Sequence, residues 1–207
     1  MPVRVKICGI TSIADALLAA EAGADAVGFM FSEQSPRAIS FSLAAQIAAQ
    51  LPPFITKVGV FVDAPARQVR QAIELCGLNA LQFHGAESPK ACAGWSLPMI
   101  KAFRVENAAS ISNLSEFATA AWLLDSFVPG QFGGTGAQFN WDIAVQAKSY
   151  GRPIILAGGL TPENVAQAVE RVSPYCVDVS SGVESAPGKK DAQKVKAFVA
   201  RAKSVSM

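Results

Sequence analysis

The chain has 207 residues, of which 51% are apolar and 16% are charged, and its formal net charge is +2. This composition excludes a disordered chain, and so small a charge offers no basic surface for nucleic acid. No apolar run approaches the ~20 residues that a membrane-spanning helix needs. The N-terminal sequence MPVRVKICG lacks the apolar core of a signal peptide, so we expect a cytoplasmic protein that contacts neither nucleic acid nor membrane.

Eight short apolar runs, rich in Val, Ile, Leu and Phe, recur along the chain and predict eight strands. Their nearly continuous apolar character is typical of strands that are covered on both faces. They occupy residues 3–7, 26–31, 57–62, 80–84, 99–103, 121–125, 153–157 and 176–180.

Helix-like segments separate most of these runs. In residues 12–24, Ser12 is a candidate N-cap and Gly23 a candidate stop. In residues 161–172, Thr161 is predicted as the N-cap, with Pro162 at the first helical position. Further helices are expected over 42–51, 64–76, 108–118 and 189–202, and the weakest patterns lie at 89–94 and 141–148.

Strands that alternate with helices at this spacing indicate an α/β fold with a parallel sheet. Eight such units favour a single (β/α)8 TIM barrel over residues 1–207, for which this length is small but sufficient. An open doubly wound sheet is the alternative. No linker or change in composition divides the chain.

Unusual residues follow the predicted strands at one end only, and in a barrel this end carries the chemistry. Strand 1 ends in Cys8-Gly9, strand 4 in His84-Gly85 and strand 6 in Asp125. Arg37 lies in SPRAIS after strand 2, and Asp178 in VDVSSG at strand 8. The opposite strand ends carry nothing comparable.

Glycines after strands 7 and 8 suggest a phosphate site. Gly158-Gly159 comes before a predicted helix, and Ser180-Ser181-Gly182 follows strand 8. Glycine lets a backbone N–H approach a phosphate oxygen closely, and these two loops hold phosphate in many barrels of this kind. Each pair alone could equally form a tight turn. Occurring together, they favour a phosphorylated small-molecule substrate.

Each candidate catalytic residue also has a structural alternative. Asp125 could be a helix N-cap or, against apolar walls, a carboxyl that keeps its proton and acts as an acid. Cys8 could be a buried apolar residue, as we expect for Cys76, Cys92 and Cys176, or a thiolate base. Arg37 could be solvated or form a fork for a carboxylate, and His84 could be an ordinary loop histidine.

The remaining motifs point to no metal or cofactor. The four cysteines form no CxxC pair, and the chain has one histidine, so free thiols and no zinc are expected. FGGTGAQFNW, residues 132–141, matches neither GxGxxG nor a Walker motif and is interpreted as a lid. These residues together predict an isomerase or lyase that acts on a sugar phosphate.

The chain resembles the phosphoribosylanthranilate isomerase family of tryptophan biosynthesis over nearly its whole length. The resemblance rests on KICGIT, GADAVGFMF, SPRAIS, KVGVFV, LQFHG, LLDS, GGTGAQFNW, LAGGLTPENV and VDVSSGVESAPGKKD, in this order. One departure is Asn140, where the family usually has an aspartate, and it leaves the capping of the following helix open.

The resemblance implies an Amadori rearrangement of N-(5-phosphoribosyl)anthranilate without a cofactor. It implies Cys8 as general base and Asp125 as general acid. Arg37 would face the anthranilate carboxylate, with His84 and Asp178 also near the substrate. The phosphate would be held by loops 7 and 8, at Gly158, Gly159, Ser180, Ser181 and Gly182. A monomer or a homodimer is expected.

Three other functions are weighed against this one. The histidine-pathway ribonucleotide isomerase family performs the same rearrangement with an aspartate at the position of Cys8. A non-catalytic phosphate-binding barrel would have no need of the Cys8–Asp125 pair. A redox role for Cys8 is weakened because no resolving cysteine lies near it in the sequence.

Overall fold

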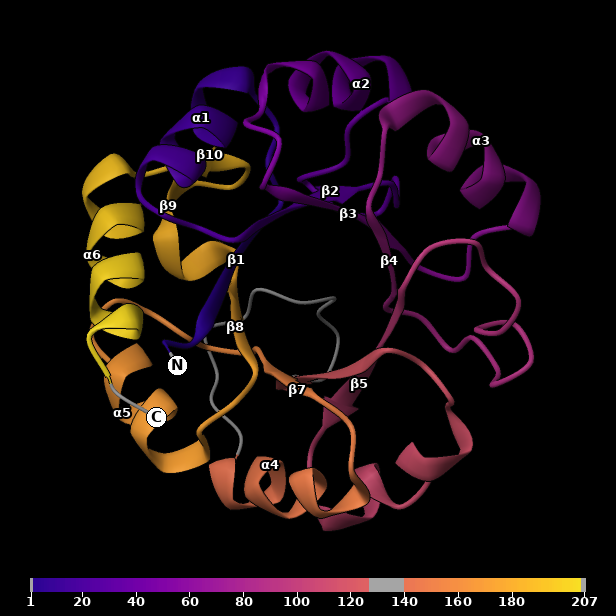
Figure 1. Cartoon of the computed structure of the whole chain (residues 1–207), viewed down its shortest axis with the longest axis vertical. Coiled ribbons are helices and arrows are strands. Elements are labelled where there is room, and N and C mark those ends of the chain that lie inside the picture. Colours follow the sequence, from indigo (N-terminus) through magenta and orange to yellow (C-terminus); the bar gives the residue numbers. More distant parts are fainter. Residues whose placement is uncertain (1, 127–139, 206–207) are drawn as a thin grey trace.

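Eight parallel strands pair side by side in chain order, and the first also pairs with the last, so that the sheet closes into a barrel (Figure 1). The computed structural model describes residues 2–126 and 140–205. The strands are β1 (Arg4–Cys8), β2 (Ala26–Met30), β3 (Thr56–Phe61), β4 (Ala80–Phe83), β5 (Met99–Val105), β6 (Ala121–Ser126), β7 (Ile154–Leu156) and β8 (Cys176–Val179). All eight predicted strands are confirmed, and the closed ring excludes the open sheet.

Helices surround the barrel, as Figure 1 shows. They are α1 (Ile13–Glu21), α2 (Phe41–Gln50), α3 (Ala66–Cys76), α4 (Trp141–Ala147), α5 (Val165–Val172) and α6 (Ala192–Lys203). Ser12 caps α1 as predicted, because its hydroxyl accepts from the Asp15 N–H. Asn140 caps α4, because its side-chain oxygen accepts from the Asp142 N–H, which settles the capping that the sequence left open. Within the described residues, no helix is long and apolar enough to cross a membrane.

Two layers of packing hold this arrangement together. The larger layer lies between strands and helices and contains bulky side chains such as Phe29, Trp122 and Phe198. The smaller layer lies inside the barrel, where side chains alternate with those of the outer layer along each strand, and includes Val58, Ala102 and Leu123. The barrel interior is therefore filled largely by apolar side chains, and the carboxyl ends of the strands carry the polar groups described below.

The chain between β5 and β6 departs from the prediction. Residues 108–118, expected to form one helix, instead form the short 3-10 helices η1 (Ala108–Ile111) and η2 (Leu114–Glu116). Asn107 and Ser110 make a capping box that spans a single turn, because short polar side chains bind nearby backbone groups in place of a longer helix. The weak pattern at 89–94 forms turns and no helix.

Two predicted helix starts are displaced. α5 begins at Val165, so Pro162 is not its first residue, but the Thr161 hydroxyl accepts from the Glu163 N–H in the turn before the helix, as a capping threonine does. The Asn164 side chain accepts from the Thr161 N–H and donates to the Gly159 carbonyl, which ties the loop after β7 to the helix. Residues 189–190, predicted as helix, form β10 (Lys189–Lys190), which pairs with β9 (Glu184–Ala186).

Phe198 tests the layer between strands and helices. Phe198 lies on α6, and its side chain is fully buried in the core between the helices and the strands. Phe198→Ala should therefore lower the free energy of unfolding by about 3–5 kcal/mol. Phe54 is 95% exposed, so the same change there should cost less than ~0.5 kcal/mol. Urea denaturation followed by tryptophan fluorescence compares the two variants. Equal losses would contradict the packing described here.

Candidate active site

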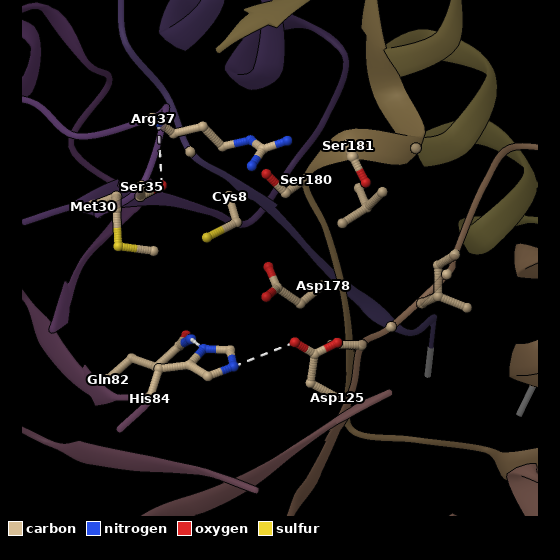
Figure 2. A pocket seen from close by; sticks show the side chains of 17 residues that line it. Cys8, Met30, Ser35, Arg37, Gln82, His84, Asp125, Asp178, Ser180 and Ser181 are labelled. Atoms are coloured by element: carbon tan, nitrogen blue, oxygen red, sulfur yellow. Dashed lines mark hydrogen bonds and ion pairs between the residues drawn. The ribbon is translucent and has the colours of Figure 1, made fainter. Parts of the chain in front are cut away.

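The carboxyl ends of the strands open into one cavity, shown in Figure 2. It encloses about 630 Å³ including its open mouth, a size that suits a small-molecule ligand. All ten residues predicted from the sequence line it: Cys8, Arg37, His84, Asp125, Gly158, Gly159, Asp178, Ser180, Ser181 and Gly182. The sequence reasoning missed Met30, Ser35 and Gln82, which also line it, because nothing in their local sequence is unusual.

Cys8 occupies the last position of β1 and is 7% exposed at the floor of the cavity. Burial raises the pKa of its thiol, and the Asp178 carboxylate adds to this rise, whereas Lys6 and Lys190 oppose it. The thiol is therefore a weaker acid than a free cysteine. A thiolate here depends on nearby positive charge.

Asp178, at β8, forms a buried ion pair with Lys6 of β1. The Lys6 Nζ donates to the Asp178 Oδ1 at 2.8 Å, and the two side chains are 2% and 8% exposed. The sequence reasoning missed Lys6. Its signal was a charged residue inside an apolar strand, two positions before Cys8 and thus on the same face.

Asp125 and His84 meet across the cavity from β6 and from the end of β4. His84 Nε2 lies 3.3 Å from Asp125 Oδ2, and on the other side of the ring the Gln82 Nε2 lies 3.0 Å from His84 Nδ1 (Figure 2). Asp125 is 7% exposed, so its carboxyl group is largely shielded from water while it still lines the cavity. It does not cap a helix in the described part of the chain.

Arg37 is held by the hairpin of β9 and β10. Its Nε and one terminal nitrogen donate to both oxygens of Glu184, at 2.8 and 2.7 Å, and the Lys190 Nζ donates to the same carboxylate at 2.8 Å. Burial opposes ionisation of Glu184, but the hydrogen bonds from Arg37 and Lys190 hold its pKa below the ordinary value. The sequence predicted that the Arg37 guanidinium would bind a ligand carboxylate with two hydrogen bonds. In the structure two of its nitrogens already bind Glu184, and Arg37 also lines the cavity.

The loops after β7 and β8 approach each other through glycines. Gly158 and Gly159 have φ of +80° and +65°, a conformation that favours glycine. A Cβ on Gly182 would collide with the Leu160 carbonyl, so that glycine is what lets the two loops touch. The Ser180 hydroxyl is buried without a hydrogen-bond partner among the described residues, and it lines the same cavity.

The predicted lid, residues 132–141, lies outside the described residues except for Asn140 and Trp141. In the described ranges, no group of three or more His, Cys, Asp and Glu side chains could hold a metal ion. The ionisable side chains that line the cavity are a thiol, two carboxyl groups, an imidazole and a guanidinium.

Comparisons with known proteins agree with this geometry. An N-(5'-phosphoribosyl)anthranilate isomerase of Geobacter metallireducens is 55% identical over 97% of this chain and 99% of its own. The solved phosphoribosyl anthranilate isomerase of Thermotoga maritima is 42% identical with a TM-score of 0.93, covering 98% of this chain and all of its own.

A solved structure of the same kind of isomerase contains reduced 1-(o-carboxyphenylamino)-1-deoxyribulose 5-phosphate. It is 40% identical with a TM-score of 0.89, over 98% of this chain and all of its own. The family model described as N-(5'phosphoribosyl)anthranilate (PRA) isomerase matches residues 5–201. The barrel, the residues at its strand ends and these matches agree, and the chain belongs to the N-(5'-phosphoribosyl)anthranilate isomerase family.

Proposed function

We propose that this isomerase converts N-(5-phosphoribosyl)anthranilate to 1-(2-carboxyphenylamino)-1-deoxyribulose 5-phosphate, the third step of tryptophan synthesis from chorismate. The reaction is an Amadori rearrangement in which the protein's own side chains act as acid and base, without a cofactor. One observation carries the proposal: a thiol from β1 and a carboxyl group from β6 line the same cavity as the glycine-rich loops after β7 and β8.

The first half of the reaction needs an acid. Asp125 gives its proton to the ring oxygen of the ribose, and the ring opens to an imine between C1′ and the anthranilate nitrogen. The position of His84, 3.3 Å from the Asp125 carboxyl group, supports this role because the imidazole can return a proton between turnovers.

The second half needs a base. The imine acidifies the proton on C2′, and the Cys8 thiolate removes it to leave an enolamine, in which C1′ and C2′ share a double bond. Protonation at C1′ by the Cys8 thiol and transfer of the O2′ hydroxyl proton to the Asp125 carboxylate then give the ketone and return both groups to their starting states. Burial raises the pKa of the thiol and the Lys6 charge opposes that rise, so the supply of the base depends on nearby positive charge.

The cavity distributes the other groups along the substrate. The loops with Gly159 and Gly182 would hold the phosphate, and the free edge of Arg37 would face the anthranilate carboxylate. The position of Asp178 beside Cys8 supports a contact with the sugar hydroxyls. The histidine-pathway alternative is not favoured, since its base is an aspartate at the position of Cys8.

A direct assay tests the function. Purified protein is mixed with phosphoribosylanthranilate in the presence of a metal chelator, and the loss of substrate fluorescence is followed. Turnover without added cofactor supports the proposal. Binding without turnover would identify a non-catalytic phosphate-binding barrel instead.

Removal of the acid and of the base should have different kinetic consequences. Cys8→Ser and Asp125→Asn should each lower kcat by at least ~10²–10⁴-fold, with KM much less changed, because each removes an acid–base group. A substrate deuterated at C2′ should show a larger isotope effect in Cys8→Ser and a smaller one in Asp125→Asn, where ring opening becomes slow. Cys76→Ser, remote from the cavity, is the matched control. If Cys8→Ser turned over substrate near the wild-type rate, Cys8 would have only a packing role and would not be the base.

Inorganic phosphate should raise the melting temperature, because it binds the folded protein only. Gly159→Val should abolish this rise by blocking the approach of the backbone. Gly77→Val is the control, since Gly77 has a similar φ of +58° but ends α3 outside the cavity. Both variants should melt earlier, and only the Gly77 variant should still respond to phosphate. A response retained at Gly159 would place the anion elsewhere.

Arg37→Ala should raise KM by roughly ten- to a hundredfold, because a hydrogen bond between charged groups contributes about 1.5–3 kcal/mol. Initial rates over a range of substrate concentrations measure this. Arg171→Ala is the control, because that arginine pairs with Asp142 on the surface with 61% of its side chain exposed. Glu184 keeps Lys190 as a partner in Arg37→Ala, so this variant should stay folded, which its urea midpoint checks. An unchanged KM in the folded variant would overturn the role of Arg37.

A further inference from the structure

Lys6 is a fully buried cation that the mechanism above leaves without a task. It is 1% exposed and is among the largest side chains that the barrel interior hides from water. A buried ammonium group is costly unless it is paired, and an apolar side chain of similar length would fill the same space. Its place inside the barrel therefore needs a reason other than packing.

The register of the strands sets Lys6 between two groups of the cavity. Lys6 pairs with Asp178 in the β1–β8 ladder, and its ammonium group donates to that carboxylate at 2.8 Å. Cys8 follows two residues later on the same face of β1. Lys6 itself does not line the cavity, whereas Cys8 and Asp178 both do.

Gly28 provides the space in which the lysine approaches the sulfur. It lies opposite Cys8 in the β1–β2 ladder. A Cβ added there would lie 2.8 Å from the Cys8 Sγ and 3.2 Å from the Lys6 Cε. The sulfur and the end of the lysine stem thus both border the small space beside Gly28, and a side chain at this position would have to displace one or both of them.

The other charges around Cys8 come from four further elements. Arg37 and Lys190 share the Glu184 carboxylate on one side, and His84 and Asp125 lie across the cavity. β2 faces the sulfur with Gly28 and Met30, which are uncharged. Arg37 and Lys190 are thus both paired with Glu184, whereas Lys6 is the cation that lies on the same face of β1 as the Cys8 sulfur. Asp178 is the anion that competes with the thiolate for the Lys6 charge.

We propose that Lys6 is a positioning residue for the isomerisation: its ammonium group, held by Asp178, stabilises the Cys8 thiolate and so determines how much of the enzyme carries the base. The inference rests on the proposed role of Cys8. Burial dominates the raised pKa of this thiol, Lys6 is the largest charge that opposes the rise, and Asp178 adds to it. The two members of the ion pair therefore act on the thiolate with opposite sign.

Alkylation of Cys8 by iodoacetamide measures the thiolate without any substrate. The rate is followed against pH on the folded full-length protein, by mass spectrometry of the peptide that contains Cys8. Lys6→Met should move the midpoint of the profile to higher pH by about one to three units, which is a tenfold or greater loss of thiolate at a given pH. Asp178→Asn should move it to lower pH.

The double variant Lys6→Met with Asp178→Asn keeps the test valid if either single change fails to fold. It leaves no unpaired buried charge, so it should retain its urea midpoint within the spread expected of a conservative change. Its alkylation midpoint should still lie above that of the wild type, because the end of the Lys6 stem borders the same small space beside Gly28 as the sulfur. A purely structural ion pair would leave this midpoint unmoved.

Lys101→Met is the matched control. Lys101 is 3% exposed and pairs with Glu87 at 2.8 Å, but it lies on the face of β5 that points away from the barrel interior. Its loss should lower stability and leave the alkylation profile of Cys8 unchanged. A shift equal to that of Lys6→Met would show that any buried cation has this effect and would overturn the proposal.

Measurements of turnover distinguish a failure of the role proposed for Lys6 from a failure of the proposed function. In Lys6→Met, the ascending, acid-side limb of kcat/KM should move to higher pH in parallel with the alkylation midpoint, because the base must be deprotonated to act, while KM changes little. Unmoved midpoints in both Lys6→Met and the double variant overturn the role of Lys6, even where Cys8→Ser is inactive. Wild-type turnover in Cys8→Ser overturns the proposed function instead, whatever Lys6 does to the thiol.

Discussion

The hydrogen bonds between β1 and β8 are the constraint on which the rest of this structure depends. They close the sheet, and their register sets Lys6 directly beside Asp178. Because side chains alternate along a strand, a slip of one residue would turn Cys8 and Asp178 toward the helices. The same ladder thus holds the barrel together and brings the thiol into one cavity with Asp178, which lies 170 positions further along the chain.

The charged groups at the upper end of the barrel form two buried sets. One is Lys6 with Asp178, and the other is Glu184 with Arg37 and Lys190. Removal of charges from water is costly, so each carboxylate is satisfied by ammonium or guanidinium donors at hydrogen-bond distance. These sets contain three cations and two carboxylates, an excess of one positive charge. That excess favours a thiolate and an anionic ligand in a site that burial would otherwise keep neutral.

Local sequence was a good guide where local physics dominates. Runs of β-branched and aromatic residues became strands, and Ser12 caps α1 because its hydroxyl needs only a neighbouring backbone N–H. Local sequence was a poorer guide where polar side chains near a helix end can form more than one set of hydrogen bonds. Thr161 makes its capping hydrogen bond, yet the regular helix begins only at Val165, because the Asn164 side chain binds the Thr161 N–H and the Gly159 carbonyl of the loop after β7. The segment 108–118 stops at single 3-10 turns because its Asn and Ser side chains bind the backbone themselves.

The sequence by itself determined which chemical groups end the strands, since that order depends only on apolar runs and on the residues that follow them. It thereby predicted the barrel and the set of residues around its cavity. Only the tertiary structure decided which groups are partners. Lys6 meets Asp178 across 172 positions, and Arg37 meets Glu184 across 147. Such pairs depend on closure, register and the fold of the β9–β10 hairpin, which are properties of the whole barrel, and no local pattern of residues encodes them.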